Sequence, residues 1–205
     1  LGAEQLASFV ELLSESQRPL IYAGGGVING EASAALTEFA EALHIPVVTT
    51  LMGIGSIDTT HPLAMHMLGM HGVAAANYAV EDCDFLIAIG ARFDDRVAGD
   101  PKKFARAARA IAHLDVDRSE INKVKAVRWH YVGLLPDALQ QLRVAVQSAA
   151  RQRDYGAWLA HLGALRHRYA MNYQRTGELV QPHYVIEEIN RHTRGEAIIT
   201  TGVGQ

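Results

Sequence analysis

Four charged residues follow the glycine that ends the most apolar run of the chain. Arg92, Asp94, Asp95 and Arg96 come directly after Gly90. Open α/β sheets bind ligands at the carboxyl ends of their strands. A guanidinium there can pair with a diphosphate through its planar fork, while a carboxylate holds it in place. A surface ion-pair network is the alternative. We favour the anion site, because like-charged neighbours at a strand end need a partner to offset their repulsion.

A glycine-rich turn follows an earlier apolar run. Gly24, Gly25 and Gly26 come after residues 20–23, and a helical pattern follows them. Glycine lets the backbone approach a ligand closely, and the N–H groups at a helix start favour negative charge. The spacing does not satisfy the G-x-G-x-x-G fingerprint, which disfavours a standard NAD-binding unit. The turn is therefore either a phosphate-binding loop or an ordinary strand-to-helix connection.

The segment 65–72 is rich in methionine and glycine and has neither a helical nor a strand period. Flexible thioethers can accommodate a flat aromatic ring, and a core loop filled by methionine is the alternative. His61, His66 and His71 lie five residues apart, with no carboxylate or cysteine to complete a ligand set. That spacing does not face one side of a helix, so no metal site is predicted.

Two carboxylates, Asp115 and Asp117, lie at the end of an apolar run that begins at residue 110. We expect Asp115 to accept a hydrogen bond from a ribose or adenine group, as acids at such strand ends do in dinucleotide folds. Asp117 could do the same or cap the segment that follows it. Cys83 stands between two aspartates, which would raise the pKa of its thiol, so we expect no nucleophilic role.

Apolar runs alternate with helical patterns along the first part of the chain. Buried strands are predicted at 20–23, 46–49, 85–89, 110–116 and 130–132, with amphipathic helices such as 31–44 and 73–81 between them. Continuous apolar strands separated by helices are typical of a mostly parallel sheet covered on both faces. The predicted fold class is α/β, a Rossmann-like, doubly wound sheet.

The composition changes beyond residue 147, which indicates three parts. We expect a nucleotide-binding domain over 1–147, a helical connector over 148–181 and the start of a further α/β domain over 182–205, with a helix from Pro182 and a strand at 197–200. The final glycine-rich turn would lead into a helix in a complete α/β unit. Because no helix follows, we expect the sequence to be an excerpt from a longer polypeptide.

Composition and charge narrow the class of protein. The chain has 205 residues, a net charge of -3 and a single cysteine. No basic field is present to hold a nucleic acid or an anionic membrane surface. No apolar stretch approaches the roughly 20 residues of a membrane span, and the amino terminus does not follow the pattern of a signal peptide. We therefore expect an intracellular protein without nucleic-acid or membrane partners.

Six segments, in order along nearly the whole chain, resemble the motifs of the acetolactate (acetohydroxyacid) synthase catalytic subunit, a thiamine-diphosphate enzyme family. They are YAGGGVING, TTLMGIGSID, HMLGMHG, AANYAVEDCDFLIAIGARFDDRVAG, AHLDVD and ITTGVGQ. The pairing of LGMHG with GARFDDRV is the most specific among them. The resemblance implies a middle domain that binds FAD in a structural rather than redox role, between two thiamine-binding modules.

The resemblance also implies which residues contact each cofactor, and it places no catalytic residue or metal ligand in this chain. The diphosphate or ribityl chain of FAD would contact Gly24, Gly25 and Gly26, together with Gly90, Arg92, Asp94, Arg96 and Val97. The flavin would contact Thr50, Leu51, Met52, Leu68, Gly69, Met70 and His71. The adenosine end would contact Asp115 and Val116, and thiamine diphosphate would contact Val203, Gly204 and Gln205. The substrate channel would be bordered by Met70, Asp95 and Arg96.

The implied activity is the condensation of pyruvate with a second 2-keto acid in branched-chain amino-acid biosynthesis. Thiamine diphosphate and Mg²⁺ would be held mainly outside this chain, so we expect the chain alone to be inactive. A homodimer or homotetramer, a regulatory small subunit as partner, and a cytoplasmic or plant plastid location are also implied. The alternatives are another thiamine-diphosphate enzyme, such as a glyoxylate carboligase-like one, or a nucleotide-binding module without catalysis.

One position departs from the family pattern. The family commonly has a Gly-Asp pair near the adenine, after the last strand, whereas Leu134 follows Gly133 here. Loss of that carboxylate implies weaker recognition of the adenine.

Overall fold

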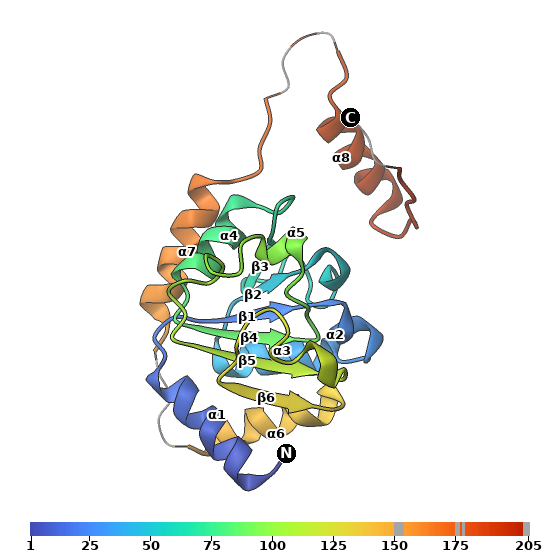
Figure 1. The fold of residues 1–205 in the computed structure, drawn as a ribbon. Coiled ribbons are helices and arrows are strands. Elements are labelled where there is room, and N and C mark those ends of the chain that lie inside the picture. Colours follow the sequence, from blue (N-terminus) through green and yellow to red (C-terminus); the bar gives the residue numbers. More distant parts are fainter. Residues whose placement is uncertain (150–153, 175–176, 178, 203–205) are drawn as a thin grey trace. The chain divides into compact units, whose positions relative to one another are not determined.

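A computed structural model describes residues 1–149, 154–174, 177 and 179–202. The chain divides into two compact units, Leu1–Tyr169 and Ala170–Gln205 (Figure 1). The first unit contains the sheet and the candidate site. In the second unit, α8 spans Pro182–Thr193 as the sequence predicts, and the Tyr173 hydroxyl donates to Glu187 Oε2 at 2.5 Å.

The first unit is built on a six-stranded sheet in which every strand pairing is parallel (Figure 1). The strands are β1 Pro19–Ala23, β2 Val47–Thr49, β3 Ala64–Met67, β4 Phe85–Ile89, β5 Ala110–Asp115 and β6 Trp129–Val132. Their order is β3-β2-β1-β4-β5-β6. The chain thus winds outward from β1 in one direction and from β4 in the other, which confirms the predicted doubly wound α/β fold and puts its switch point between β1 and β4.

Helices cover the sheet on both faces (Figure 1). One layer contains α1 Ala3–Glu15, α3 Ser33–Leu43 and α6 Leu135–Ser148, with α6 packed against the other two. In the other layer, α4 Ala74–Asp82 packs against α7 Gly156–Arg168. Short helices occupy loops at the carboxyl ends of strands: α2 Gly25–Asn29, η1 Leu51–Gly53, α5 Asp95–Ala98 and η2 Arg118–Glu120. Within the described residues, no helix combines the length and apolar character needed to cross a membrane.

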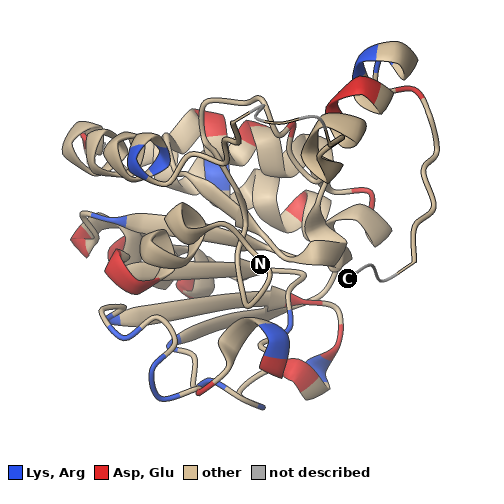
Figure 2. Ribbon diagram, turned by 90° about the horizontal axis from the view of Figure 1, so that it is seen from above, with Lys and Arg blue, Asp and Glu red and all other residues tan. Residues whose placement is uncertain are grey.

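The strands carry almost no charge. All residues of β1, β2, β4 and β5 are buried, as expected for parallel strands covered on both faces. Asp115 is the only Asp, Glu, Lys or Arg in the six described strands. Figure 2 shows that the charged residues gather instead on loops and helices around the sheet. Charges near the strand ends therefore come from the loops and from Asp115.

Two buried residues, Asp84 and Trp158, hydrogen-bond backbone groups at the amino-terminal edge of the sheet. Asp84 accepts hydrogen bonds from the backbone N–H groups of Gln17 and Arg18, at 3.0 and 2.9 Å. The Trp158 indole of α7 donates to the Pro19 carbonyl at 2.9 Å. Helix α7, which lies in the predicted connector, therefore packs within the first compact unit. The functional boundaries at residues 147 and 181 stay predictions.

Three local features differ from the sequence-based expectations. Strand β3 lies in the segment where no period is visible. The helix expected over 31–44 begins at Ser33, because Glu31 has a positive φ of 51° and separates α3 from α2. The strand expected at 197–200 is wrong: these residues form no strand, and Ile198 is 97% exposed. An apolar run becomes a strand only where another strand pairs with it, and within the described part of the chain none pairs with 197–200.

Candidate functional site

Two glycine loops meet at the switch point of the sheet. The Gly24 N–H donates to Ile89 O at 3.0 Å, and the Gly26 N–H donates to Gly90 O at 2.9 Å. A Cβ on Gly24 would lie 2.2 Å from Gly90 O, and one on Gly26 would lie 2.7 Å from Gly90 Cα. These glycines are therefore required for the loops after β1 and β4 to pass each other. The crevice outside such a switch point is where doubly wound sheets bind ligands.

The loops after β2 and β3 join the same edge. The Thr50 N–H donates to Ala23 O at 2.9 Å, and the Met70 N–H donates to Arg96 O at 2.9 Å. The second bond connects the LGMHG segment directly with the GARFDDRV segment. The structure thus brings the predicted flavin-contacting and phosphate-contacting loops side by side, although they lie apart in sequence.

Asn77 of α4 holds the loop after β3 in its shape. Its Oδ1 accepts from the Gly69 N–H at 2.8 Å, and its Nδ2 donates to Gly69 O at 3.0 Å. Gly69 has a φ of 97°, and a Cβ there would lie 2.8 Å from Arg96 O. A left-handed glycine held on both polar groups gives this loop one defined conformation.

Large apolar side chains are exposed next to these loops. Leu51, Met52 and Met70 are 68%, 72% and 67% exposed. Adjacent exposed apolar side chains mark a surface that a ligand or a partner can cover, and thioethers adapt to a flat ring. Leu68 differs from them, because it is only 3% exposed and belongs to the core.

The two arginines of the segment after β4 have only weak ion pairs. Arg92 lies 3.9 Å from Asp94, and Arg96 lies 4.0 Å from Asp95, with both arginine side chains at least two-thirds exposed. Exposed pairs at such distances contribute little to stability. The guanidinium groups are therefore accessible to an anionic ligand, and the ion pairs of the alternative surface network are loose contacts. Asp94 also precedes helix α5 as its N-cap residue.

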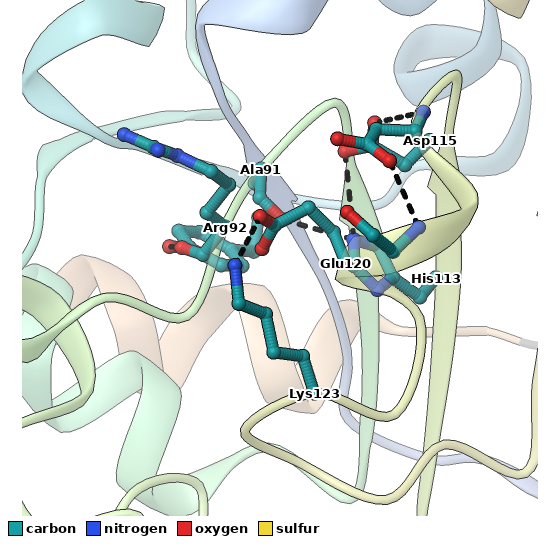
Figure 3. A network of polar contacts seen from close by, with 9 residues as sticks. Ala91, Arg92, His113, Asp115, Glu120 and Lys123 are labelled. Atoms are coloured by element: carbon teal, nitrogen blue, oxygen red, sulfur yellow. Dashed lines mark hydrogen bonds and ion pairs between the residues drawn. The ribbon is translucent and has the colours of Figure 1, made fainter.

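A buried histidine connects the loop after β4 to the end of β5 (Figure 3). The His113 Nε2 lies 2.9 Å from Ala91 O and 3.7 Å from Asp115 Oδ2. Burial opposes ionisation of Asp115, but the nearby His113 ring and the hydrogen bond from the Asp117 N–H outweigh it and lower the pKa of the carboxyl. Asp115 is therefore an ionised hydrogen-bond acceptor at neutral pH.

Further predicted residues have other local roles. Asp117 caps η2, because its side chain accepts from the Ser119 N–H at 2.8 Å, as the capping alternative expects. Burial, followed by the charges of Asp84 and Glu81, raises the pKa of Cys83, in agreement with the predicted unreactive thiol. Among the residues that the structure describes, no group of three or more His, Cys, Asp or Glu is arranged to hold a metal ion.

The remaining predicted residues lie at the same edge or outside the described part. Thr50 caps η1, His71 and Val116 are exposed, and Val97 packs partly against the core. Residues Val203, Gly204 and Gln205 lie outside the described residues. Leu134 is 69% exposed at the start of α6, and the Gly133 N–H beside it donates to Asp115 O at 3.0 Å. The departure from the family pattern thus lies next to Asp115.

Sequence reasoning does not find three residues that shape this site. Tyr22, Asn77 and His113 each hydrogen-bond a backbone group of a site loop. The only signal available from the sequence is a polar group within an otherwise apolar strand or helix face. A cavity of about 590 Å³, lined by Arg18, Asp82 and Trp158 among others, lies at the opposite, amino-terminal edge and contains none of the predicted site residues.

Comparison with known proteins agrees with this architecture. Residues 6–142 match the family model described as "Thiamine pyrophosphate enzyme, central domain". The chain is 42% identical to acetolactate synthase 3, chloroplastic, from Brassica napus over 203 residues, which are 98% of this chain and 31% of that protein. It is also 42% identical to the acetolactate synthase large subunit of Corynebacterium glutamicum, over 99% of this chain and 33% of that protein.

The chain spans about a third of the length of the curated relatives it matches. The family model covers most of the first compact unit, from α1 to α6. The chain therefore belongs to the family of thiamine pyrophosphate enzyme central domains.

Proposed function

We propose that this chain is the central, FAD-binding part of an acetolactate synthase catalytic subunit. The observation that carries the proposal is the contact between its two most specific segments, in which the Met70 N–H donates to Arg96 O at 2.9 Å beside the switch point. Relatives named acetolactate synthase, at 42% identity over nearly the whole chain, support the assignment. The longer protein would condense pyruvate with a second 2-keto acid in branched-chain amino-acid biosynthesis.

The exposed and ionised groups along the carboxyl edge of the sheet suit the three parts of FAD: the flavin ring, the diphosphate and the adenosine end. Exposed Met52 and Met70 would lie against the flavin ring, and exposed Arg92 would pair with the diphosphate. Ionised Asp115 would accept hydrogen bonds from the adenosine end. From β3 to β5 the sheet spans four strand spacings, about 19 Å at about 4.8 Å each. A ligand that reaches both ends must therefore be extended.

The residues bordering the predicted substrate channel are exposed on the same edge. Arg96 and Asp95 side chains are 70% and 87% exposed, and Met70 is 67% exposed. The Arg96 guanidinium would attract the carboxylate of a 2-keto acid, and Met70 would contact its apolar part. When bound, thiamine diphosphate supplies the electron sink for decarboxylation and carbon–carbon bond formation. In this proposal FAD has a structural role, and the thiamine diphosphate and Mg²⁺ sites belong mainly to the rest of the longer protein.

The FAD proposal is tested by titrating the purified chain with FAD and following flavin absorbance and fluorescence. We expect one FAD per chain and a yellow protein. Arg92→Ala should weaken binding about tenfold or more, because a charge-assisted hydrogen bond is lost. Arg106→Ala is the control, since Arg106 is an exposed arginine outside the site. Stoichiometric binding of an adenine nucleotide without any affinity for FAD would count against the proposal and favour a simple nucleotide-binding module.

The activity is tested separately with pyruvate. The chain alone should form no acetolactate, whereas the longer protein should form it in the presence of thiamine diphosphate and Mg²⁺. Acetolactate formation by the chain alone would contradict the assignment of the chemistry to other parts of the protein. A longer protein that used glyoxylate but not pyruvate would favour a glyoxylate carboligase-like enzyme. We further propose that the longer protein is a homodimer or homotetramer, with a regulatory small subunit as a partner, in the cytoplasm or a plastid.

A further inference from the structure

Two buried side chains from different strands hold consecutive carbonyl groups at the start of the segment 91–97. The Tyr22 hydroxyl of β1 donates to Arg92 O at 2.5 Å. The His113 Nε2 of β5 lies 2.9 Å from Ala91 O (Figure 3). Both side chains are fully buried. The main chain that leads to the charged residues of the site is therefore held from two directions.

The ring of Phe93 adds a third restraint to the same stretch. It packs against the Tyr22 ring with centroids 5.5 Å apart, and against the His113 ring edge-to-face at 5.3 Å. Phe93 itself is 3% exposed. The same two side chains, Tyr22 and His113, thus hydrogen-bond the carbonyls of Ala91 and Arg92 and pack against the ring of Phe93. Exposed loops usually have fewer restraints than this.

The Tyr22 hydroxyl and the His113 Nε2 must each carry a hydrogen to donate to a carbonyl of the loop. Burial, and then the negative charge of Asp94, raises the pKa of the Tyr22 phenol, so its hydroxyl keeps its proton at neutral pH. A carbonyl oxygen only accepts hydrogen bonds, so the His113 Nε2 carries a hydrogen when it binds Ala91 O. Both groups therefore act as donors to the loop.

We propose that Tyr22 and His113 are positioning residues for the anion-binding segment, holding the backbone at 91–93 so that Arg92 is presented to the diphosphate of the bound dinucleotide. The proposal rests on the proposed FAD site. Neither side chain needs to touch the ligand, because each acts through a carbonyl group of the loop. His113 lies 3.7 Å from Asp115 as well, so it connects the loop with the predicted adenosine contact.

The test compares single-atom and single-donor changes in the full 205-residue chain. Tyr22→Phe removes only the hydroxyl and keeps the ring packing. His113→Leu removes the donor, whereas His113→Gln keeps an amide N–H near the position of Nε2. The matched control is Ser16→Ala, which also removes one buried hydroxyl donor, but at the amino-terminal edge, where Ser16 Oγ lies 2.5 Å from Asp84 Oδ1.

Two measurements are made on each variant: FAD affinity by titration, and hydrogen exchange of the ligand-free chain, read on a peptide covering residues 92–99. Tyr22→Phe should weaken FAD binding about 3- to 10-fold, the effect of one lost hydrogen bond. His113→Leu should do at least the same, and His113→Gln should restore most of the affinity. The Val97 and Gly99 amides, bonded to Asp94 O and Asp95 O, should exchange about fivefold faster or more in Tyr22→Phe.

Ser16→Ala should leave both FAD affinity and this local exchange near the values of the unsubstituted chain. If Ser16→Ala weakens FAD binding as much as Tyr22→Phe does, the effect is a general loss of stability and the proposal is overturned. Unchanged affinity in Tyr22→Phe would overturn it too. If the unsubstituted chain binds no FAD, the proposed function fails, and hydrogen exchange alone decides whether the two residues hold the loop. Unchanged exchange there would refute the positioning role.

Discussion

Replacing Asp84 by asparagine tests how the sheet holds β1 against β4, the two strands that flank the candidate site. The Asp84 carboxylate is buried and anchors the turn between α1 and β1, where Pro19 of β1 lies opposite Phe85 of β4. It accepts four hydrogen bonds, from Ser16 Oγ at 2.5 Å, Gln17 N at 3.0 Å, Arg18 N at 2.9 Å and Arg109 Nη2 at 3.3 Å. The residue therefore ties the turn before β1 to the start of β4 at the amino-terminal edge of the sheet.

The expected loss of stability depends on which hydrogen bonds of the Asp84 carboxylate an asparagine can still make. Its oxygen can keep the two bonds to Oδ1, but its NH₂ group would face the donors of Gln17 and Arg109, which both bind Oδ2. A partly buried N–H without an acceptor costs about 1–3 kcal/mol. Arg109 is largely exposed, so loss of its pair adds at most about 1 kcal/mol. We expect Asp84→Asn to lower the free energy of unfolding by about 1–4 kcal/mol, and Tm by roughly 2–16 °C.

The pH dependence of stability gives a second, independent test of the role of the Asp84 carboxylate. Burial alone would raise the pKa of Asp84, but the hydrogen bonds from Ser16, Gln17 and Arg18 outweigh it and hold the pKa below its ordinary value. The unfolded chain has the ordinary value of about 4. Because the folded pKa is the lower one, the stabilisation by Asp84 is complete above about pH 4 and is lost as pH falls through the folded pKa. The difference in free energy of unfolding between the unsubstituted chain and Asp84→Asn should therefore shrink below about pH 4.

The assay is urea unfolding from pH 7 down to pH 3, followed by the fluorescence of Trp129 and Trp158, which are both buried. Asp82→Asn is the control, because Asp82 is two residues away and has one exposed pair with His161 at 2.8 Å. It should change stability by at most about 1 kcal/mol. A loss below about 1 kcal/mol in Asp84→Asn, or a loss that stays constant down to pH 3, would refute the reasoning.

Three further predictions follow from single residues. Asn77→Ala removes both hydrogen bonds to Gly69, so it should weaken FAD binding severalfold and lower the free energy of unfolding by about 1–2 kcal/mol. Titration with FAD and thermal unfolding measure the two effects, and unchanged FAD affinity would contradict the role of this loop. Leu134→Asp should stabilise the chain by about 1 kcal/mol as the N-cap of α6 and tighten FAD binding, and looser binding would speak against an adenine contact there. Cys83 should react with thiol reagents only as fast as the chain unfolds, and rapid labelling of the folded chain would disprove its burial.

The sequence predicts five of the six strands, most of them because they are apolar runs between helical patterns; the brief strand at 130–132 is the exception, since it includes the exposed His130. It misses β3, since Met65 and His66 belong to a methionine-rich segment that shows no period of two. Among the described strands, this short strand pairs only with β2, at the edge of the sheet, and its pairing is irregular. Local pattern cannot reveal such a strand, because what makes it a strand is the neighbour with which it pairs.

The loops of the candidate site are more predictable from sequence than the contacts that hold them. Glycine and charge mark the segments 24–26 and 90–96 directly, because both residue types stand out after an apolar strand. Tyr22 does not stand out, since a tyrosine within an apolar run is an ordinary core residue. Its role depends on Arg92 O, which lies 70 residues further along the chain and is brought near only by the pairing of β1 with β4.

The division between rigid backbone and exposed side chains explains how such an edge can bind a ligand. Backbone groups of the loops are fixed by neighbouring loops and by the buried donors of Tyr22, Asn77 and His113, whereas the side chains of Arg92 and Met70 remain exposed. A rigid backbone reduces the conformational entropy that ligand binding must overcome. The fixed loops would therefore contribute to affinity, whereas the exposed side chains would decide which ligand is bound. Substitutions of buried donors should thus weaken all dinucleotides alike, and substitutions of exposed side chains should change the preference among them.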